Sequence, residues 1–415
     1  MNAPLTRPQT DAETGLERQF KALAVAEPWR QAAFARFAGL GLPNRRVEAW
    51  HFTDMRAAMA QALPLAAPDS QIAKTRLRGL AAEGTRLVFV NGGFVPAASD
   101  TLPEGVTIRL DQRVPEAHAD ALVTLNQAFA PQATLLEIAP GTLLQAPLQL
   151  IFAHGGPASA VFSRVGVKVG EGAQITLGEI YDGLDHGHHI NSLLDIEVGD
   201  KASVAHGCDG AGADALCVLS LFVRLGHMAK FTSFAMLDGG RMMRRQIFAD
   251  LAGEHADIAL SGLMLGRGAA HLDTTLTINH AQPHGMSREI FRSLLDDAAH
   301  GVYQGKVIVK PHAQKTDGKM MSKAILLHDG ARMDNKPELE IFADDVVCGH
   351  GATVGGLDAE QIFYLQARGI PRPEAEALLL EAFAAEVIEP VENDGFKRHF
   401  KDRLAHWLQA RGGSV

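Results

Sequence analysis

The sequence contains few of the residues on which several common protein classes depend. Only three of its 415 residues are cysteines (Cys208, Cys217 and Cys348), which excludes a disulfide framework and points to the reducing cytosol. The first 15 residues hold no apolar stretch of the signal-peptide kind, so we expect a cytoplasmic protein. Aromatic residues make up only 6% of the chain, which indicates a thin, layered core.

Positive charge is scarce as well. With 39 Lys and Arg against 48 Asp and Glu, the net charge is −9, which argues against nucleic acid or an anionic membrane as a partner. The longest uncharged run, residues 138–163, contains six glycines and prolines in total, and a membrane-spanning helix does not tolerate so many. We therefore expect a soluble protein.

Short catalytic motifs are also absent from the sequence. It has no phosphate-binding loop, dinucleotide-binding glycine motif, zinc-protease motif or serine-hydrolase elbow. Cysteine pairs separated by two residues, which build thiolate zinc and iron–sulfur sites, are missing too. These absences argue against the enzyme classes that carry such motifs, although catalysts also work without short motifs.

The patterns that are present divide the chain into three zones. Apolar residues at helical spacing run from about residue 11 to 63 and again near the C-terminus, where Asp358 is a good helix N-cap. Between these zones, short alternating runs such as RVGVKVG and GKVIVK are typical of strands. We predict an N-terminal helical region (1–85), a strand-rich core (86–355) and a C-terminal helical domain (356–415).

A sequence repeat indicates how the core is built. The pattern Gly-x-x-Ala-x-apolar recurs at steps of 29, 27 and 27 residues, which marks a repeat architecture. Because each repeat carries strands, we predict a right-handed parallel β-helix of about 27 residues per coil, with a set of β-hairpins as the alternative. We expect the glycine to supply a turn residue with positive φ, and the alanine to fit between adjacent coils. The four glycines are Gly170, Gly199, Gly226 and Gly253.

One segment near the end of the core carries candidate chemistry. Cys348 and His350 lie two residues apart, so on a strand both face the same side, and a thiolate beside an imidazole suits a metal such as iron. Two other interpretations stay open: a small buried cysteine beside a turn histidine, or a Cys–His nucleophile without a third orienting group. The preceding acidic pair, Asp344 and Asp345, either favours cation approach or forms a solvated turn.

Other histidines are weaker candidates. His186, His188 and His189 resemble metal ligands, but neighbouring strand residues point to opposite faces, so a solvated loop is the preferred interpretation. His280 and His284 are expected to be polar surface or turn residues in the same way. None of these five histidines receives a function from the sequence.

Several stretches of the sequence resemble a known family. They are HLDTTLTINHAQPHGMSREI, GVYQGKVIVKPHAQKTDGKMMSKAILL and KPELEIFADDVVCGHGATVGGLDAEQIFYLQARGI, with RVEAWHFTDMR near the N-terminus as a further match. The sequence resembles the SufB/SufD family of iron–sulfur cluster assembly scaffolds, in its SufD branch. The likeness covers most of the chain and is strongest from about 265 to 390. It implies a right-handed parallel β-helix with helical regions at both ends.

The resemblance also implies a role. SufD-type chains are non-ATPase subunits that pair with SufB through the β-helix and bind the ATPase SufC through the C-terminal helical domain. A transient iron–sulfur cluster is expected at the SufB–SufD interface, with His350 as the ligand and Cys348 as its metal-sensitive neighbour. The residues that we expect to dock SufC, on the first C-terminal helix, are Phe363, Tyr364, Leu365 and Arg368.

Departures from SufB-type chains limit what this chain does alone. SufB-type chains carry an acceptor cysteine in an Asn-Cys-Asp-Ser run, and Ser322 lies near that position here. We therefore expect that the isolated chain binds no cluster tightly and that it needs a partner. The alternatives are a homodimer without a cluster role and a secreted-type polysaccharide-active β-helix enzyme, which needs paired carboxylates on an exposed strand face. For the docking helix, the alternative is that its apolar face packs inward.

Overall fold

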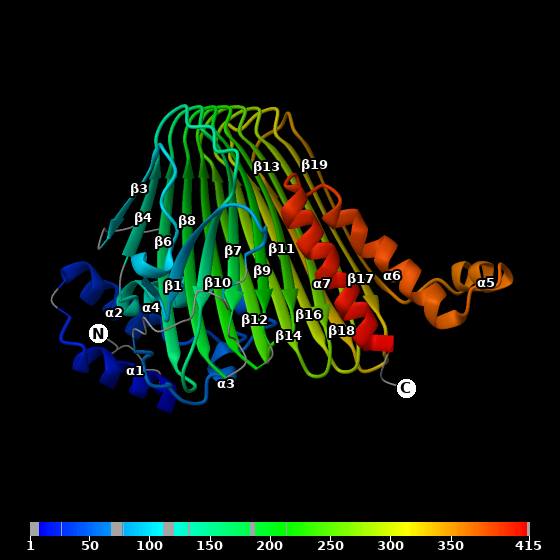
Figure 1. The fold of residues 1–415 in the computed structure, drawn as a ribbon, viewed down its shortest axis with the longest axis horizontal. Helices are drawn as coiled ribbons and strands as arrows, with labels where there is room; N and C mark the ends of the chain where they lie inside the picture. The colour runs from blue at the N-terminus through cyan, green and yellow to red at the C-terminus, as the bar shows by residue number, and fades with distance from the viewer. Residues whose placement is uncertain are drawn as a thin grey trace.

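The fold is a parallel β-helix with helical regions at both ends (Figure 1), as the sequence predicts. The structure, a computed structural model, describes residues 8–25, 27–67, 77, 79–110, 120–131, 133–182, 187–212 and 214–412. The helices are α1 (Asp11–Ala22), α2 (Pro28–Leu40), η1 (Glu48–Trp50), α3 (Met55–Ala58), η3 (Pro96–Ala98), α4 (Ala121–Phe129), α5 (Ala359–Ala367), α6 (Arg372–Ile388) and α7 (Asp394–Gly412). The strands are β1 (Thr85–Val90), β2 (Gly93–Phe94), β3 (Val106–Leu110), β4 (Ala133–Ile138), β5 (Leu148–Ala153), β6 (Ala160–Val169), β7 (Gln174–Asp182), β8 (His189–Val198), β9 (Ser203–Ala211), β10 (Leu216–Leu225), β11 (Lys230–Asp238), β12 (Met242–Leu251), β13 (Asp257–Gly266), β14 (His271–His280), β15 (Met286–Leu295), β16 (His300–Val309), β17 (Asp317–Leu326), β18 (Arg332–Ile341) and β19 (Val347–Gly355).

Two sheets form the walls of the β-helix. Among the described residues, sheet 1 has the strand order β19-β17-β15-β13-β11-β9-β7-β5-β1-β2, and sheet 2 has the order β18-β16-β14-β12-β10-β8-β6-β4-β3. At the N-terminal end, the pairs β1–β2 and β3–β4 are antiparallel, whereas the following strands pair in parallel. In sheet 2, the strands from β6 to β18 begin at residues 160, 189, 216, 242, 271, 300 and 332, so one coil takes 26 to 32 residues. The predicted period of about 27 lies within this range.

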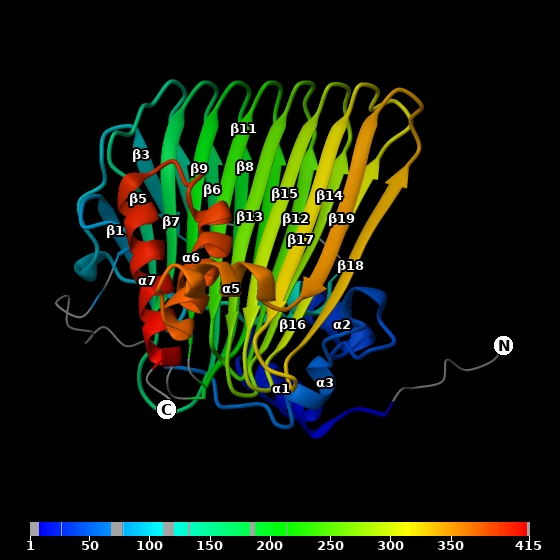
Figure 2. The ribbon, with the colours of Figure 1, turned by 90° about the vertical axis from the view of Figure 1, so that its right-hand side faces the viewer.

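The space between the two sheets, here called the lumen, holds the main hydrophobic core. Alternate strand residues point into it, and those from successive coils stack into one continuous cluster. Helices α1 and α4 pack on the outer face of sheet 2. Helices α6 and α7 pack on the outer face of sheet 1 (Figure 2). No helix in the described part of the chain has the length and apolar character needed to cross a membrane.

The repeat glycines have a different role from the predicted one. The positive φ angles lie two residues later, at Gly172, Lys201, Met228 and His255, so the prediction of a positive φ at the glycine itself is wrong. The glycine lies where adjacent coils approach most closely: a Cβ on Gly253 would lie 2.1 Å from the backbone nitrogen of His227. The repeat alanines are buried between coils, as predicted. The motif therefore reflects two features: the close packing of the backbones of adjacent coils at the glycine, and a turn two residues later.

Candidate functional site

The β-helix has an open end at its last coil, which consists of β18 and β19 and is called the terminal coil here. Strand β18 pairs with β16 and β19 pairs with β17, and each is the last strand of its sheet in the described chain. Phe342, directly after β18, and Val347 of β19 are 60% and 62% exposed. An unpaired strand edge with exposed apolar side chains is a template for another chain.

Cys348 and His350 occupy lumen-facing positions of β19. They are in register with Gly318 and Met320 of β17, and Met320 is buried in the lumen. Because β19 is the last strand of sheet 1, Cys348 is half-buried and His350 is exposed. Burial raises the pKa of the Cys348 thiol, a hydrogen bond with the backbone of Gly318 opposes the rise, and nearby carboxylates add to it. The two residues therefore share one open surface.

Beneath this pair, the lumen holds a carboxyl group that the sequence analysis missed. Glu289 of β15 is in register with Met320, so it occupies the same row as His350, two strands deeper in sheet 1. It is fully buried, and neither carboxyl oxygen accepts a hydrogen bond from any described residue. Burial raises the pKa of Glu289 to about 8, and the Ser287 hydroxyl offsets this only in part, because its geometry falls short of a hydrogen bond. The alternation in MSREIF, which puts Ser287 and Glu289 on the inward face with Phe291, was the available signal.

Other candidate ligands near the terminal coil are not gathered around the site. Asp344 and Asp345 are exposed, and Asp345 pairs with Lys315. Ser322 faces the lumen and donates a hydrogen bond to Oδ1 of Asn335 at 2.8 Å. Across the described ranges, no three His, Cys, Asp or Glu side chains lie close enough together to hold a metal ion. A metal ion at the terminal coil would need further ligands from a partner or from solution.

A second polar cluster lies deeper in the lumen. Arg245 of β12 donates hydrogen bonds to Oε2 of Glu179 at 2.9 Å and to the sulfur of Cys208 at 3.1 Å. The Tyr181 hydroxyl donates to the same carboxylate, and Nε2 of His206 lies 3.4 Å from it. Burial alone would raise the pKa of Glu179, but Arg245, His206 and Tyr181 outweigh it and hold the pKa well below its usual range. All five side chains are buried, so we assign this cluster to the framework.

Helix α5 carries its predicted docking residues on the surface. Figure 1 shows α5 projecting away from the β-helix at the C-terminal side. Phe363 and Tyr364 are 72% and 58% exposed, Leu365 is half-buried, and exposed Arg368 donates a hydrogen bond to the Tyr364 hydroxyl at 3.1 Å. Ile362 is the buried residue of this helix. The alternative of inward packing is therefore wrong for Phe363 and Tyr364.

The histidines singled out by the sequence have different environments. His186 lies outside the described residues. His188 is fully buried and accepts a hydrogen bond from the backbone N–H of Ser159 at 3.2 Å, so the solvated loop is wrong for it. His280 is also fully buried, and burial lowers its pKa to about 4, so the expectation of a surface or turn residue is wrong there too. His284 is an exposed turn residue with φ +61°, as predicted.

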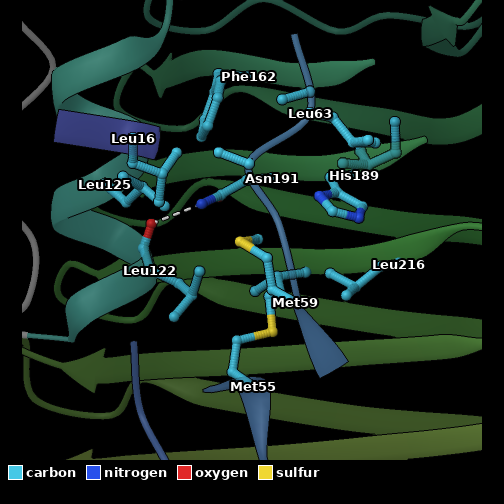
Figure 3. Close-up of a pocket in the computed structure, with 14 residues that line it drawn as sticks. Leu16, Met55, Met59, Leu63, Leu122, Leu125, Phe162, His189, Asn191 and Leu216 are labelled. Carbon is cyan, nitrogen blue, oxygen red and sulfur yellow. Dashed lines mark hydrogen bonds between the residues drawn. The ribbon is translucent and has the colours of Figure 1, made fainter. Parts of the chain in front are cut away.

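A small cavity between the N-terminal region and sheet 2 is too small to be a ligand site. Figure 3 shows Leu16 and Met55 among the apolar side chains around it, together with the polar residues His189 and Asn191. The Asn191 side chain donates a hydrogen bond to the Leu122 carbonyl at 2.8 Å. The free volume is about 10 Å³, which is room for about one water molecule. The cavity holds neither a substrate nor a cofactor of ordinary size.

Comparisons with known proteins assign this architecture to a family. Residues 152–383 match the family model described as SUF system FeS cluster assembly, SufBD core domain, and residues 15–150 match the SufBD protein N-terminal region. The chain is 30% identical to the iron–sulfur cluster assembly protein SufD of Escherichia coli (strain K12), over 92% of this chain and 93% of that protein. It is 28% identical to an iron–sulfur cluster assembly SufBD family protein of Synechocystis, over 87% of this chain and 86% of that protein. The chain therefore belongs to the SufBD family of the SUF system of iron–sulfur cluster assembly.

Proposed function

We propose that this chain is a non-catalytic scaffold subunit of a SUF-type complex in the cytoplasm. It pairs with a SufB-type subunit through the terminal coil, and a nascent iron–sulfur cluster forms there beside His350 as cargo. A SufC-type ATPase docks on the C-terminal helical domain and supplies the ATP hydrolysis. The observation that carries the proposal is the open terminal coil, where Cys348 and His350 share one accessible surface.

The two free edges of the terminal coil differ in how well they accept a partner strand. Strand β19 reads VCGHGATVG and has no proline and no Asp, Glu, Lys or Arg. Strand β18 reads RMDNKPELEI and carries Pro337 with five charged residues. Charge and proline protect an edge strand against pairing, because they add repulsion and remove a backbone donor. We therefore expect the partner strand to extend sheet 1 at β19.

The small number of ligands on this chain supports a shared site. Cys348 and His350 supply one sulfur and one imidazole, whereas clusters are held by about four such ligands. A partner that closes the open end contributes the remaining ligands and covers the exposed side chain of Val347. The exposed ring pair on α5, Phe363 and Tyr364, is a separate surface that suits a second partner.

The test is coexpression of the tagged chain with the SufB and SufC of its host. Subunit stoichiometry, iron and acid-labile sulfide are measured for the wild type, for His350→Ala and for His227→Ala, which alters a turn histidine several coils away. We expect a three-subunit complex in all three, with cluster content lost in His350→Ala alone. A complex with unchanged iron in His350→Ala contradicts the ligand role. A chain that forms only a homodimer and recruits neither partner contradicts the proposed function.

A further inference from the structure

The lumen below the terminal coil contains a buried carboxylic acid, Glu289, to which the proposed scaffold role assigns no function. One inward row of sheet 1 stacks Glu289, Met320 and His350, and Cys348 lies on the same strand as His350, two residues away. Adjacent strands of a sheet lie about 4.8 Å apart, so the backbone of Glu289 is roughly 10 Å below that of His350. Met320, only 2% exposed, lies between them.

The surroundings of Glu289 compensate the burial of its carboxyl group only in part. From β16, the buried hydroxyl of Tyr303 is near enough for Glu289 to raise its pKa, and it has no hydrogen-bond partner within the described part of the chain. On β15 itself, Arg288 is turned to the outer face, where it pairs with Asp317 of β17 at 2.5 Å. Among the described residues, no ion pair reaches Glu289. A buried acid kept without a partner costs folding free energy, which is a reason to look for a role in binding.

We propose that Glu289 is the internal counter-charge for a divalent cation held by Cys348 and His350, and that it releases its proton when the cation arrives. This inference rests on the proposed function, which brings iron to the terminal coil. The thiol of Cys348 and the carboxylic acid of Glu289 each lose one proton to solvent, the thiolate binds the cation, and the carboxylate stays in the lumen. No electron is transferred.

The distance gives the size of the effect. The Cys348 thiolate cancels one charge of the divalent cation, so the terminal coil gains one net positive charge. At an effective dielectric constant of about 20, one positive charge roughly 10 Å away lowers the proton affinity of a carboxyl group roughly tenfold. The pKa of Glu289 without a cation is about 8, so such a change converts it from mostly protonated to mostly ionised at pH 7.5. Because coupling between two binding events is reciprocal, the ionised carboxylate strengthens cation binding to a similar degree.

The experiment uses Co²⁺ as the probe on the full chain under anaerobic conditions. The thiolate-to-cobalt absorption band reports binding at Cys348, and its loss in Cys348→Ser confirms its origin. At pH 7.5 we expect the wild type to bind Co²⁺ with release of more than one proton and with weakening of the infrared carbonyl band of a protonated carboxyl group. Glu289→Gln is expected to bind Co²⁺ about threefold to tenfold more weakly, to release one proton at most and to show no such infrared change.

The matched control is Asp250→Asn, which removes a partly exposed carboxylate that is paired with Arg224 several coils away from the terminal coil. We expect its Co²⁺ affinity to stay within twofold of the wild type. Thermal unfolding establishes that Glu289→Gln is folded. The inference is overturned if Glu289→Gln matches the wild type in affinity and proton release, or if the wild type shows no band that depends on Cys348. In either case, a three-subunit complex that still assembles shows that the proposed function stands without it.

Discussion

Two buried carboxyl groups in the same lumen are held in opposite charge states. Glu179 lies 2.9 Å from the Arg245 guanidinium, which together with His206 and Tyr181 keeps its pKa low despite burial. Glu289, near the open end, is equally buried but has no such partner, and burial raises its pKa to about 8. Burial is the same, so the partner decides the charge. The deep lumen thus holds a carboxylate in an ion pair, whereas the carboxyl group under the terminal coil has no ion-pair partner among the described residues.

The largest effect is expected from the removal of Arg245, the ion-pair partner of Glu179. Arg245→Met leaves Glu179 as an unpaired charge in the lumen, and breaking a buried ion pair in this way costs about 3–5 kcal/mol. The free energy of unfolding, measured by urea titration, is expected to fall by that amount. The control is Arg224→Ala, which breaks an exposed pair with Asp250 of similar length, 2.8 Å, and is expected to cost less than about 1 kcal/mol. Equal losses in the two variants contradict the distinction.

The pH dependence of the free energy of unfolding tests the same contrast between Glu179 and Glu289, with Glu289→Gln as the variant. A carboxyl group whose pKa is higher in the folded chain than in the unfolded chain stabilises the fold fully at low pH and loses that contribution as the pH rises. Between about pH 4.5 and 8, the wild type should lose up to about 1.4 kcal/mol per pH unit relative to Glu289→Gln. The measurement is a series of urea titrations of both proteins at several pH values.

Glu179→Gln is the matched variant for that series. The pKa of Glu179 is lowered in the folded chain, so its contribution is complete above the unfolded value of about 4.5 and is lost only as the pH falls further. The stability difference between Glu179→Gln and the wild type should therefore be constant from pH 5 to 8. A parallel slope in the two variants would show that Glu289 is not protonated in the folded chain.

The sequence repeat predicted the architecture of the core, but it did not predict how closely adjacent coils pack. The recurring alanines and the strand alternation are local features, so they gave the parallel β-helix and its period directly. The role of Gly253 depends on the backbone of the coil below it, and no local pattern shows how closely two coils approach. His188 and His280 were misjudged for the same reason, because their burial is set by neighbouring coils.

The candidate site was predictable only in part. The spacing of Cys348 and His350 gave a shared face, and the register with Gly318 and Met320 is consistent with it. Alternation also places both Glu179 and Glu289 inside, but their different charge states depend on a guanidinium 66 residues away from the first of them. Pairing between distant positions is a property of the folded coil stack, and a single sequence does not contain it.

Close packing between coils can be tested at a repeat glycine. Gly253→Ala puts a Cβ about 2.1 Å from the backbone nitrogen of His227, so the coils must move apart, and overpacking of this kind typically costs about 1–3 kcal/mol. Urea titration measures the loss. Gly39→Ala, on the exposed side of α2 with no atom within 4 Å of the new Cβ, is the control and should stabilise the chain by about 0.5–1 kcal/mol. A stabilising effect of Gly253→Ala would show that adjacent coils leave enough space for a methyl group.

The smallest effect on stability is expected at the exposed surface of α5, where the largest effect on assembly is proposed. Phe363 is 72% exposed, so Phe363→Ser removes almost no buried area and should change the free energy of unfolding by less than about 0.5 kcal/mol. Its recovery of the SufC-type ATPase in a pull-down should nevertheless fall sharply, because an exposed aromatic side chain is a typical interface anchor. Leu378→Ser, on the exposed side of α6, is the control and should recover the ATPase normally. If both variants recover it equally, the ATPase docks elsewhere, and the exposure of Phe363 needs another explanation.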